Sequence, residues 1–230
     1  MTRRVVFLAA LLAWGVTAYQ APGTHPVTGR KIAGVMGMSG ADWLVRPERE
    51  AEEQPEKALD ALKLKPGMVV ADIGAGVGYM SLRMAKRVGP SGRVYANDLQ
   101  PEMLTKLNEN AAKSKITNVV TVLGDVADPK LPPNTMDLVL LVDVYHEFSQ
   151  PQQMLRKIRE TLKPDGRLVL LEYRAEDPNV PINPEHKMTV GQVKAEIEAE
   201  GFVLQPVIET LPRQHILILT KAAAKAAGAR

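Results

Sequence analysis

The chain has 230 residues, of which 45% are hydrophobic and 24% charged, so it can form one α/β domain with an appendage. The absence of cysteine excludes disulfides, thiol catalysis and cysteine-ligated metals. The net charge is +3, and it falls to +1 when residues 1–18 are left out, because they contain Arg3 and Arg4 and no acidic residue. The sequence also has no basic stripe interleaved with aromatic residues, so a nucleic-acid partner is not expected.

The first segment has the pattern of a secretory signal peptide. A basic start precedes an apolar run over residues 5–16, and Val16 and Ala18 suit cleavage after Ala18. We therefore expect a periplasmic or secreted protein, with an uncleaved N-terminal membrane anchor as the alternative. No later segment approaches a spanning length, so no other membrane contact is expected.

Residues 19–54 are expected to form a linker or lid. Residues 19–41 are rich in Gly and Pro without a clean period, whereas 42–64 become helical, with Pro47 and Pro55 at first-turn positions. Trp43, Arg46 and Glu50 either select a flat or charged ligand or attach this segment to the domain.

From residue 68 to 221, apolar strands alternate with amphipathic helices. Strands are predicted over residues 68–74, 92–98, 118–125, 136–143, 166–173, 202–209 and 214–221. Helices are predicted over residues 79–89, 101–114, 150–163 and 189–201, the last with Thr189 as N-cap. This alternation indicates a doubly wound α/β fold with a mostly parallel seven-strand sheet, and the short last connection makes the final pair an antiparallel hairpin. The domain is expected over residues 55–221, followed by a basic Ala-rich tail, 222–230.

The turn after the first strand, VADIGAGVGYM at residues 70–80, indicates a nucleotide-like ligand. Ligands of doubly wound sheets lie at the carboxyl ends of the strands, and glycines allow the backbone to approach closely. Here Gly74, Gly76 and Gly78 do not follow the dinucleotide spacing, and Asp72 in front of them would repel a pyrophosphate. A cationic, phosphate-free adenosine compound such as S-adenosylmethionine fits better than NAD.

Three further strand ends carry polar residues. Asp98 ends the second strand and suits the hydroxyls of a ribose, while Asp125 after the third suits an adenine amine, with the Val126 amide at a ring nitrogen. The fourth strand ends at Asp143 and is followed by Tyr145, His146 and Glu147. Each of these aspartates taken alone is equally consistent with a turn or a cap.

Together these motifs resemble those of class I S-adenosylmethionine-dependent methyltransferases of the small-molecule kind. The resemblance covers about residues 55–221 and rests on VADIGAGVGY, VYANDLQPEML, GDVADPKLPPNTMDLVLLVDVYHEF and LRKIRETLKPDGRLVLLEY. It implies strand order 3-2-1-4-5-7-6 with strand seven antiparallel. It also implies S-adenosyl-L-methionine as cofactor and a small-molecule methyl acceptor. The cofactor-binding residues so implied are Asp72, Gly74, Ala75, Gly76, Gly78, Tyr79, Asp98, Leu99, Asp125, Val126 and Asp143.

The acceptor is expected near Tyr145, His146 and Glu147, with His146 as the candidate general base. The alternative is that His146 only packs the start of the next helix. No metal site is expected, because H-E-x-x-H would need a second histidine where Gln150 stands. His186 is placed in a solvent loop, or by resemblance at the acceptor pocket. The oligomeric state is left open.

A second function remains open on the same residues. An exported protein would meet little of a cofactor made in the cytosol, so the chain could instead bind an adenosine compound without transferring a methyl group.

Overall fold

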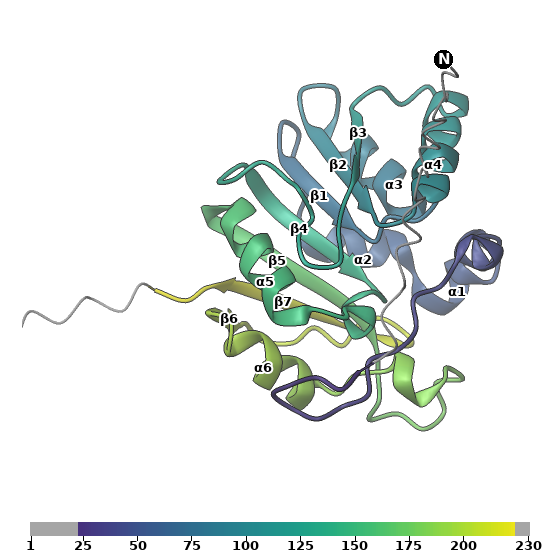
Figure 1. Cartoon of the computed structure of the whole chain (residues 1–230). Coiled ribbons are helices and arrows are strands. Elements are labelled where there is room, and N and C mark those ends of the chain that lie inside the picture. Colours follow the sequence, from purple (N-terminus) through teal and green to yellow (C-terminus); the bar gives the residue numbers. More distant parts are fainter. Residues whose placement is uncertain (1–22, 224–230) are drawn as a thin grey trace, which may run out of the picture.

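The computed structural model describes residues 23–223, which form an α/β domain around one twisted sheet (Figure 1). The predicted signal peptide and most of the predicted tail lie outside the described residues. In the described part, no helix has the length and apolar character needed to cross a membrane.

The elements follow the predicted order. The strands are β1 (Val69–Ile73), β2 (Arg93–Asp98), β3 (Val119–Leu123), β4 (Met136–Val142), β5 (Leu162–Tyr173), β6 (Phe202–Leu204) and β7 (Gln214–Lys221). The α-helices are α1 (Arg49–Glu53), α2 (Pro55–Leu62), α3 (Tyr79–Val88), α4 (Pro101–Lys113), α5 (Pro151–Thr161) and α6 (Val190–Glu198). Short 3₁₀ turns are η1 (Met38–Gly40), η2 (Trp43–Val45), η3 (Tyr145–Glu147) and η4 (Pro184–His186).

The sheet has the order β3-β2-β1-β4-β5-β7-β6, which confirms the predicted topology. The strands from β3 to β5 pair in parallel, whereas β7 pairs antiparallel with both β5 and β6. The order reverses between β1 and β4, so the loops after these two strands diverge and leave a crevice at their carboxyl ends.

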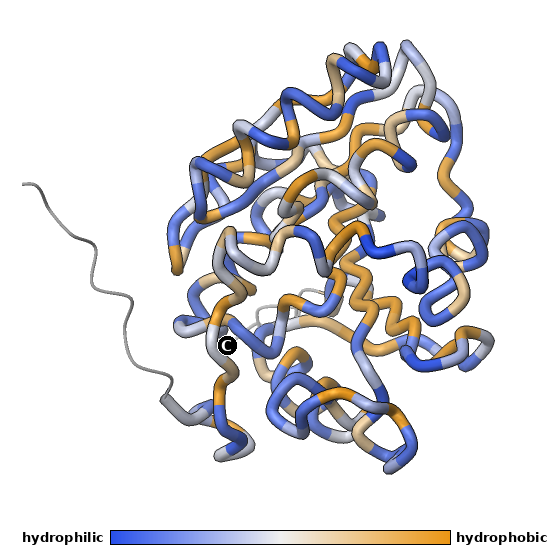
Figure 2. The backbone as a smooth tube through the Cα atoms, turned by 90° about the vertical axis from the view of Figure 1, so that its right-hand side faces the viewer, coloured by the Kyte–Doolittle hydropathy of each residue, from blue (hydrophilic) through white to orange (hydrophobic). Residues whose placement is uncertain are grey.

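Both faces of the sheet are covered, as expected from the continuous apolar strands (Figure 2). Val70, Leu138 and Leu140 pack with α2 and α3 on one face. Their sequence neighbours, such as Val139 and Leu141, pack with α5 and α6 on the other face. The central strands are therefore fixed from both sides, and so are the loops that leave their ends.

Three predicted boundaries are corrected. The helix expected after Pro47 is broken into α1 and α2 at Gln54, which has a left-handed φ of 49°, because Pro55 has no N–H to continue the first helix. The strand predicted over 202–209 ends at Leu204, since Pro206 cannot donate to a ladder, and only an isolated bridge joins Ile208 to Ile216. The fifth strand begins four residues early, with an irregular register opposite Met136 and Leu138.

The N-terminal segment drapes over the carboxyl ends of the strands. It runs past α6 before reaching α1 (Figure 1). The Ala33 amide donates to the His146 carbonyl (3.1 Å), Gln100 Nε2 donates to the Met36 carbonyl (2.9 Å), and Arg30 pairs with the buried Glu196 (2.9 Å). This segment closes the crevice from above, and its residues Ile32 to Met36 line the cavity beneath it.

Candidate active site

A cavity of about 670 Å³ lies under the N-terminal segment at the carboxyl ends of β1, β2 and β4. The loops after these strands contribute the side or main chains of Gly74, Gly76, Asp98, Leu99, Asp143, His146 and Glu147. Val126, from the loop after β3, also reaches it. The cavity therefore joins eight of the residues singled out in the sequence, from four separate loops.

The glycine turn packs too tightly for side chains. Gly74, Gly76 and Gly78 have φ values of 71°, 51° and 92°. A Cβ on Gly74 would lie 2.5 Å from Val144 Cγ2, and one on Gly76 would lie 2.7 Å from Leu44 Cδ1. Gly74 and Gly76 thus let the turn contact Val144 and Leu44 at the wall of the cavity. Their backbone conformations are ones that residues with a side chain rarely adopt.

Asp98 is held by the backbone around it. Its Oδ2 accepts from the Gly76 amide (2.8 Å) and its Oδ1 accepts from the Gln100 amide (2.9 Å). Burial raises its pKa above the ordinary value, although these amides oppose the shift. The carboxylate is fixed at the cavity wall, and each oxygen retains a lone pair that can accept from a ligand hydroxyl.

Asp143 presents a carboxylate oxygen that finds no donor among the described residues. Its Oδ2 accepts from Gln214 Nε2 (2.7 Å), whereas Oδ1 is buried and unpaired. Burial raises the pKa of Asp143 well above its usual range, and the nearby charges of Glu53 and Glu172 raise it further. An unpaired buried oxygen at the wall of a cavity suits an ammonium group of a ligand.

The structure places several predicted cofactor residues off the cavity. The Asp72 carboxylate is buried beneath the turn, accepts from Ser81 Oγ (2.5 Å) and does not line the cavity. Tyr79 donates from its hydroxyl to Glu50 (2.8 Å). Ala75 and Gly78 also do not line the cavity, and Asp125 is exposed. The ligand contacts of these five residues stay predictions. In the structure, Asp72 and Tyr79 form hydrogen bonds within the protein instead.

Tyr145 is also corrected as an acceptor-binding residue. Its ring is fully buried, packs edge-on against Phe148 and places the hydroxyl 3.3 Å from His25 Nε2, away from the cavity. Its backbone has a different use, because the Tyr145 amide donates to Glu172 Oε1 (3.1 Å) and so helps to fix that carboxylate.

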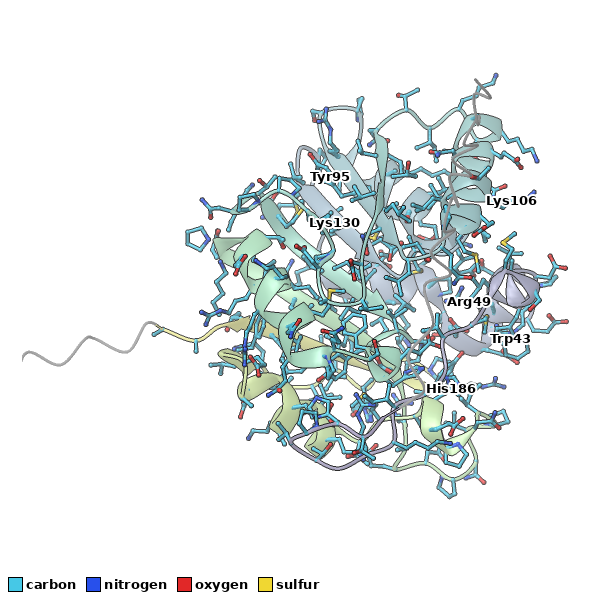
Figure 3. The ribbon with its side chains drawn as sticks, in the orientation of Figure 1. Trp43, Arg49, Tyr95, Lys106, Lys130 and His186 are labelled. Carbon is cyan, nitrogen blue, oxygen red and sulfur yellow. The ribbon has the colours of Figure 1, made fainter. Side chains whose placement is uncertain are left out.

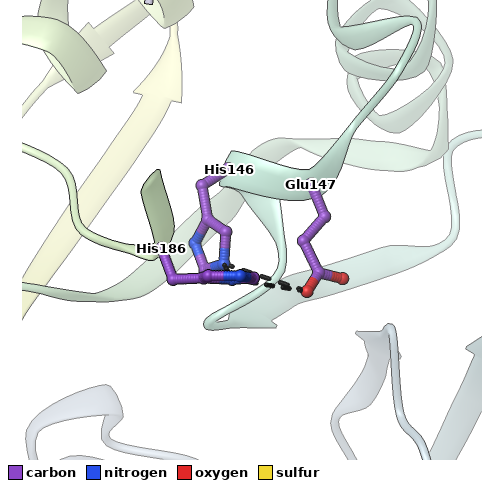
Figure 4. Close-up of side chains that lie close together, drawn as sticks. All are labelled: His146, Glu147 and His186. Carbon is purple, nitrogen blue, oxygen red and sulfur yellow. Dashed lines mark hydrogen bonds and ion pairs between the residues drawn. The ribbon is translucent and has the colours of Figure 1, made fainter. Parts of the chain in front are cut away.

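His146 is the centre of a polar group at the cavity wall. Its Nδ1 donates to Glu172 Oε2 (2.7 Å), which leaves Nε2 facing His186 Nδ1 at 3.1 Å (Figure 4). Burial lowers the pKa of His146, but the charge and hydrogen bond of Glu172 outweigh this effect and the net shift is upward. Burial raises the pKa of Glu147 to about 7. Burial lowers the pKa of His186, and the charge of His146 adds to that shift.

The placement of His186 in a solvent loop was wrong. It lies on η4 (Figure 3). It lines the cavity and meets His146 edge-on, with ring centroids 5.0 Å apart. With Glu147 the two histidines form a cluster whose possible ligand atoms all lie within 4.8 Å of one another, so the expectation of no metal site stays a prediction that this cluster puts to the test. Forty residues separate His146 from His186, and no local spacing motif indicates the pair.

The lid residues divide between two roles. Trp43 and Arg46 line the cavity, with the Arg46 guanidinium 3.7 Å over the Trp43 ring, whereas Glu50 attaches α1 to Tyr79 and Arg83. Sequence reasoning missed Arg49, which also lines the cavity and pairs with Glu53 at 2.6 Å. An arginine in an amphipathic acidic helix gives no signal of this kind.

Fold and site together define a class of protein. A family model described as a methyltransferase domain matches residues 64–217, two thirds of the chain. The chain therefore belongs to the class I S-adenosylmethionine-dependent methyltransferase family, and membership implies S-adenosyl-L-methionine as cofactor. The family and the fold expected from the sequence are confirmed.

Individual relatives show how far the similarity extends. A solved S-adenosylmethionine-dependent methyltransferase from Aquifex aeolicus is similar over 80% of this chain and 98% of that one, with a TM-score of 0.76 and 29% identity. An arsenite methyltransferase of Halobacterium salinarum is 28% identical over 60% of this chain and 38% of its own length. A nocamycin O-methyltransferase of Saccharothrix syringae is 29% identical over 61% and 48%. The chain thus spans less than half the length of these two curated relatives.

Proposed function

We propose that this protein transfers a methyl group from S-adenosylmethionine to a small-molecule acceptor. The observation that carries the proposal is the cavity itself. It runs without interruption from the glycine turn and Asp98 to His146, Glu147 and His186. Methyl transfer is an in-line displacement, and its main requirement is that donor and acceptor lie aligned in one water-poor space.

The donor end of the cavity matches the chemistry of the cofactor. Asp98 offers fixed acceptors for ribose hydroxyls, and Leu99 and Val126 give an apolar surface for a flat base. The unpaired Oδ1 of Asp143 offers a partner for the α-ammonium group. When bound, the cofactor supplies an electrophilic methyl group, and the residues of this chain contribute its binding and orientation.

The acceptor end supports proton removal from a hydroxyl. Glu172 holds His146 with Nδ1 protonated, so Nε2 carries the lone pair on the cavity side. A base oriented by a buried carboxylate is the arrangement that general-base catalysis needs. Tyr145 contributes to this arrangement through its backbone only.

Small oxygen acceptors fit this chain best. One relative is named as an O-methyltransferase of nocamycin, whereas another is named as an arsenite methyltransferase. This chain has no cysteine, so it has no thiolate for a soft arsenic(III) acceptor. The His146 group is suited to hydroxyl compounds instead.

The proposal is tested first by calorimetric titration of the purified protein with S-adenosylmethionine. Asp98→Asn is expected to weaken binding by about tenfold or more, because hydrogen bonds to a charged acceptor contribute about 1.5–3 kcal/mol. Asp165→Asn is a matched control, since this exposed carboxylate does not line the cavity. An absence of heat and of any thermal shift with the wild type would contradict the proposal.

The second test is a labelled-methyl transfer screen over small hydroxyl compounds. Transfer that is lost in His146→Ala, with cofactor binding retained, supports the base assignment. Unchanged turnover in that variant removes it. Binding of the cofactor without transfer to any compound favours the alternative, an exported adenosine-compound-binding protein.

We also propose that residues 1–18 direct export and are removed after Ala18. The basic start, the short apolar run and the small residues before the cleavage position support this. Sequencing the N-terminus of the mature protein tests it. An intact Met1 in the membrane fraction would favour an uncleaved anchor instead.

A further inference from the structure

The side chains of His146, Glu147 and His186 converge on one point at the cavity wall (Figure 4). Two come from η3, after β4, and the third comes from η4, in the loop between β5 and α6. Each offers one donor atom, respectively Nε2, Oε1 and Nδ1, and these atoms lie within 4.8 Å of one another.

From this geometry we propose that these three side chains bind one divalent transition-metal ion, for which Zn²⁺ is the best match. The distances between donor atoms are 3.1 Å for the two nitrogens and 4.0 and 3.8 Å from Glu147 Oε1 to His146 and His186. A triangle with these sides has a point about 2.1 Å from all three corners, which equals the usual length of zinc bonds to imidazole and carboxylate.

The protonation pattern also suits a metal. Nδ1–H of His146 donates a hydrogen bond to Glu172 Oε2 at 2.7 Å, so the lone pair of Nε2 is free to coordinate. A carboxylate behind a ligating histidine fixes the tautomer and raises the basicity of the ring. Glu172 is itself held by the Tyr145 amide, and both Glu172 and His146 are buried. His186 would ligate through Nδ1 with its proton on Nε2.

Three protein ligands leave at least one coordination position open. All three ligating residues line the cavity, so we assign the remaining position to the cavity side. Two histidines, one glutamate and an open position make up a catalytic type of zinc site, whereas structural zinc sites have four protein ligands. If the proposed function holds, the open position would take an oxygen of the methyl acceptor, and in the metal-bound protein the ion, in place of the His146 lone pair, would promote loss of the hydroxyl proton. Binding of the ion itself does not depend on that function.

The other candidate group of this kind, around His215, does not converge. His215 bonds to Glu209 through Nδ1 (2.6 Å) and to Glu176 through Nε2 (2.9 Å), so the two carboxylates lie on opposite sides of the ring. This makes His215 a matched control for the loss of a histidine.

The test is titration of the metal-stripped full chain with Zn²⁺, without cofactor, by calorimetry. We expect one tight equivalent per chain in the wild type. His186→Ala should weaken Zn²⁺ binding by about 100-fold and Glu147→Gln by about tenfold or more, because each variant removes one of the three bonds between the protein and the ion. His215→Gln should retain both the stoichiometry and the Kd. His186 is partly exposed on a loop, so its truncation is not expected to disturb folding.

Substitution of Co²⁺ gives a second readout. The wild type should develop visible absorption bands of a low-coordinate Co²⁺ site, and His186→Ala should lose them. The absence of a tight equivalent, or an unchanged Kd in His186→Ala, overturns the metal site. Because no cofactor is present in this titration, a failure here leaves the methyl-transfer proposal standing, and failure of cofactor binding leaves the metal site standing.

Discussion

Replacement of Asp72 by asparagine is expected to change how stability depends on pH. Burial raises the pKa of the Asp72 carboxyl from 3.8 to about 6, and the hydrogen bond from Ser81 only partly opposes this shift. Between about pH 4 and pH 6 the folded protein therefore keeps a proton that the unfolded chain has released. The sign follows directly: the free energy of unfolding falls as pH rises through this window.

The size of the effect follows from the shift. A difference of roughly two pKa units corresponds to about 3 kcal/mol that is lost between about pH 4 and pH 7. The introduced asparagine would still accept from Ser81 but would not ionise, so this loss should disappear. An unpaired amide N–H₂ at the site would cost about 1–3 kcal/mol, but equally at every pH. The informative quantity is therefore the difference in the free energy of unfolding between variant and wild type. The test is how this difference changes with pH, because its size at one pH also contains the cost of the unpaired amide.

The measurement is urea unfolding of both proteins at intervals from about pH 4 to pH 7. Relative to the wild type, Asp72→Asn should gain about 3 kcal/mol between the two ends. Ser81→Ala is a useful companion, because it removes the donor to the ionised carboxylate and should destabilise more at the upper end of this range than at the lower end. A difference between Asp72→Asn and wild type that does not vary with pH would refute the reasoning.

Three further predictions concern the site and its frame. Asp143→Asn should weaken S-adenosylmethionine binding in calorimetry by about tenfold or more, because it removes the charge opposite the α-ammonium group; an unchanged Kd would exclude the contact. Gly74→Ala should destabilise by about 2–4 kcal/mol in urea, since φ is 71° and Val144 lies 2.5 Å from the added Cβ. Thr189→Ala should cost about 1 kcal/mol, because Thr189 and Gln192 form a capping box at α6; no loss in urea unfolding would contradict that role.

Much of the fold follows from local patterns. The N-cap at Thr189 and the end of the helix over residues 79–89 at Gly89 were both predicted, and the structure confirms them. Such features depend on residues three or four positions apart, so they are visible in a single sequence. Boundaries that depend on one proline, such as Pro206, were harder because pairing partners decide where a strand ends.

The site divides in the same way. Local patterns placed Gly74, Asp98, Asp143 and His146 at the ends of the first, second and fourth strands, and a parallel sheet gathers these ends at one edge. The sequence thereby indicated the family and its cofactor. It did not predict the hydrogen bond from Ser81 to Asp72, because nothing local tells whether a carboxylate at a strand end faces a ligand or a serine in the first turn of the next helix.

The packing of segments that are distant in sequence sets which side chains face each other across the cavity. His186 reaches His146 across 40 residues, Glu172 reaches it across 26, and Gln214 reaches Asp143 across 71. These contacts depend on how β5, β7 and the loop of η4 pack against the end of β4, and no periodicity or spacing in the chain encodes that packing. The identity of the cofactor could therefore be inferred from sequence, whereas the contacts of His146 with Glu172 and His186 could not.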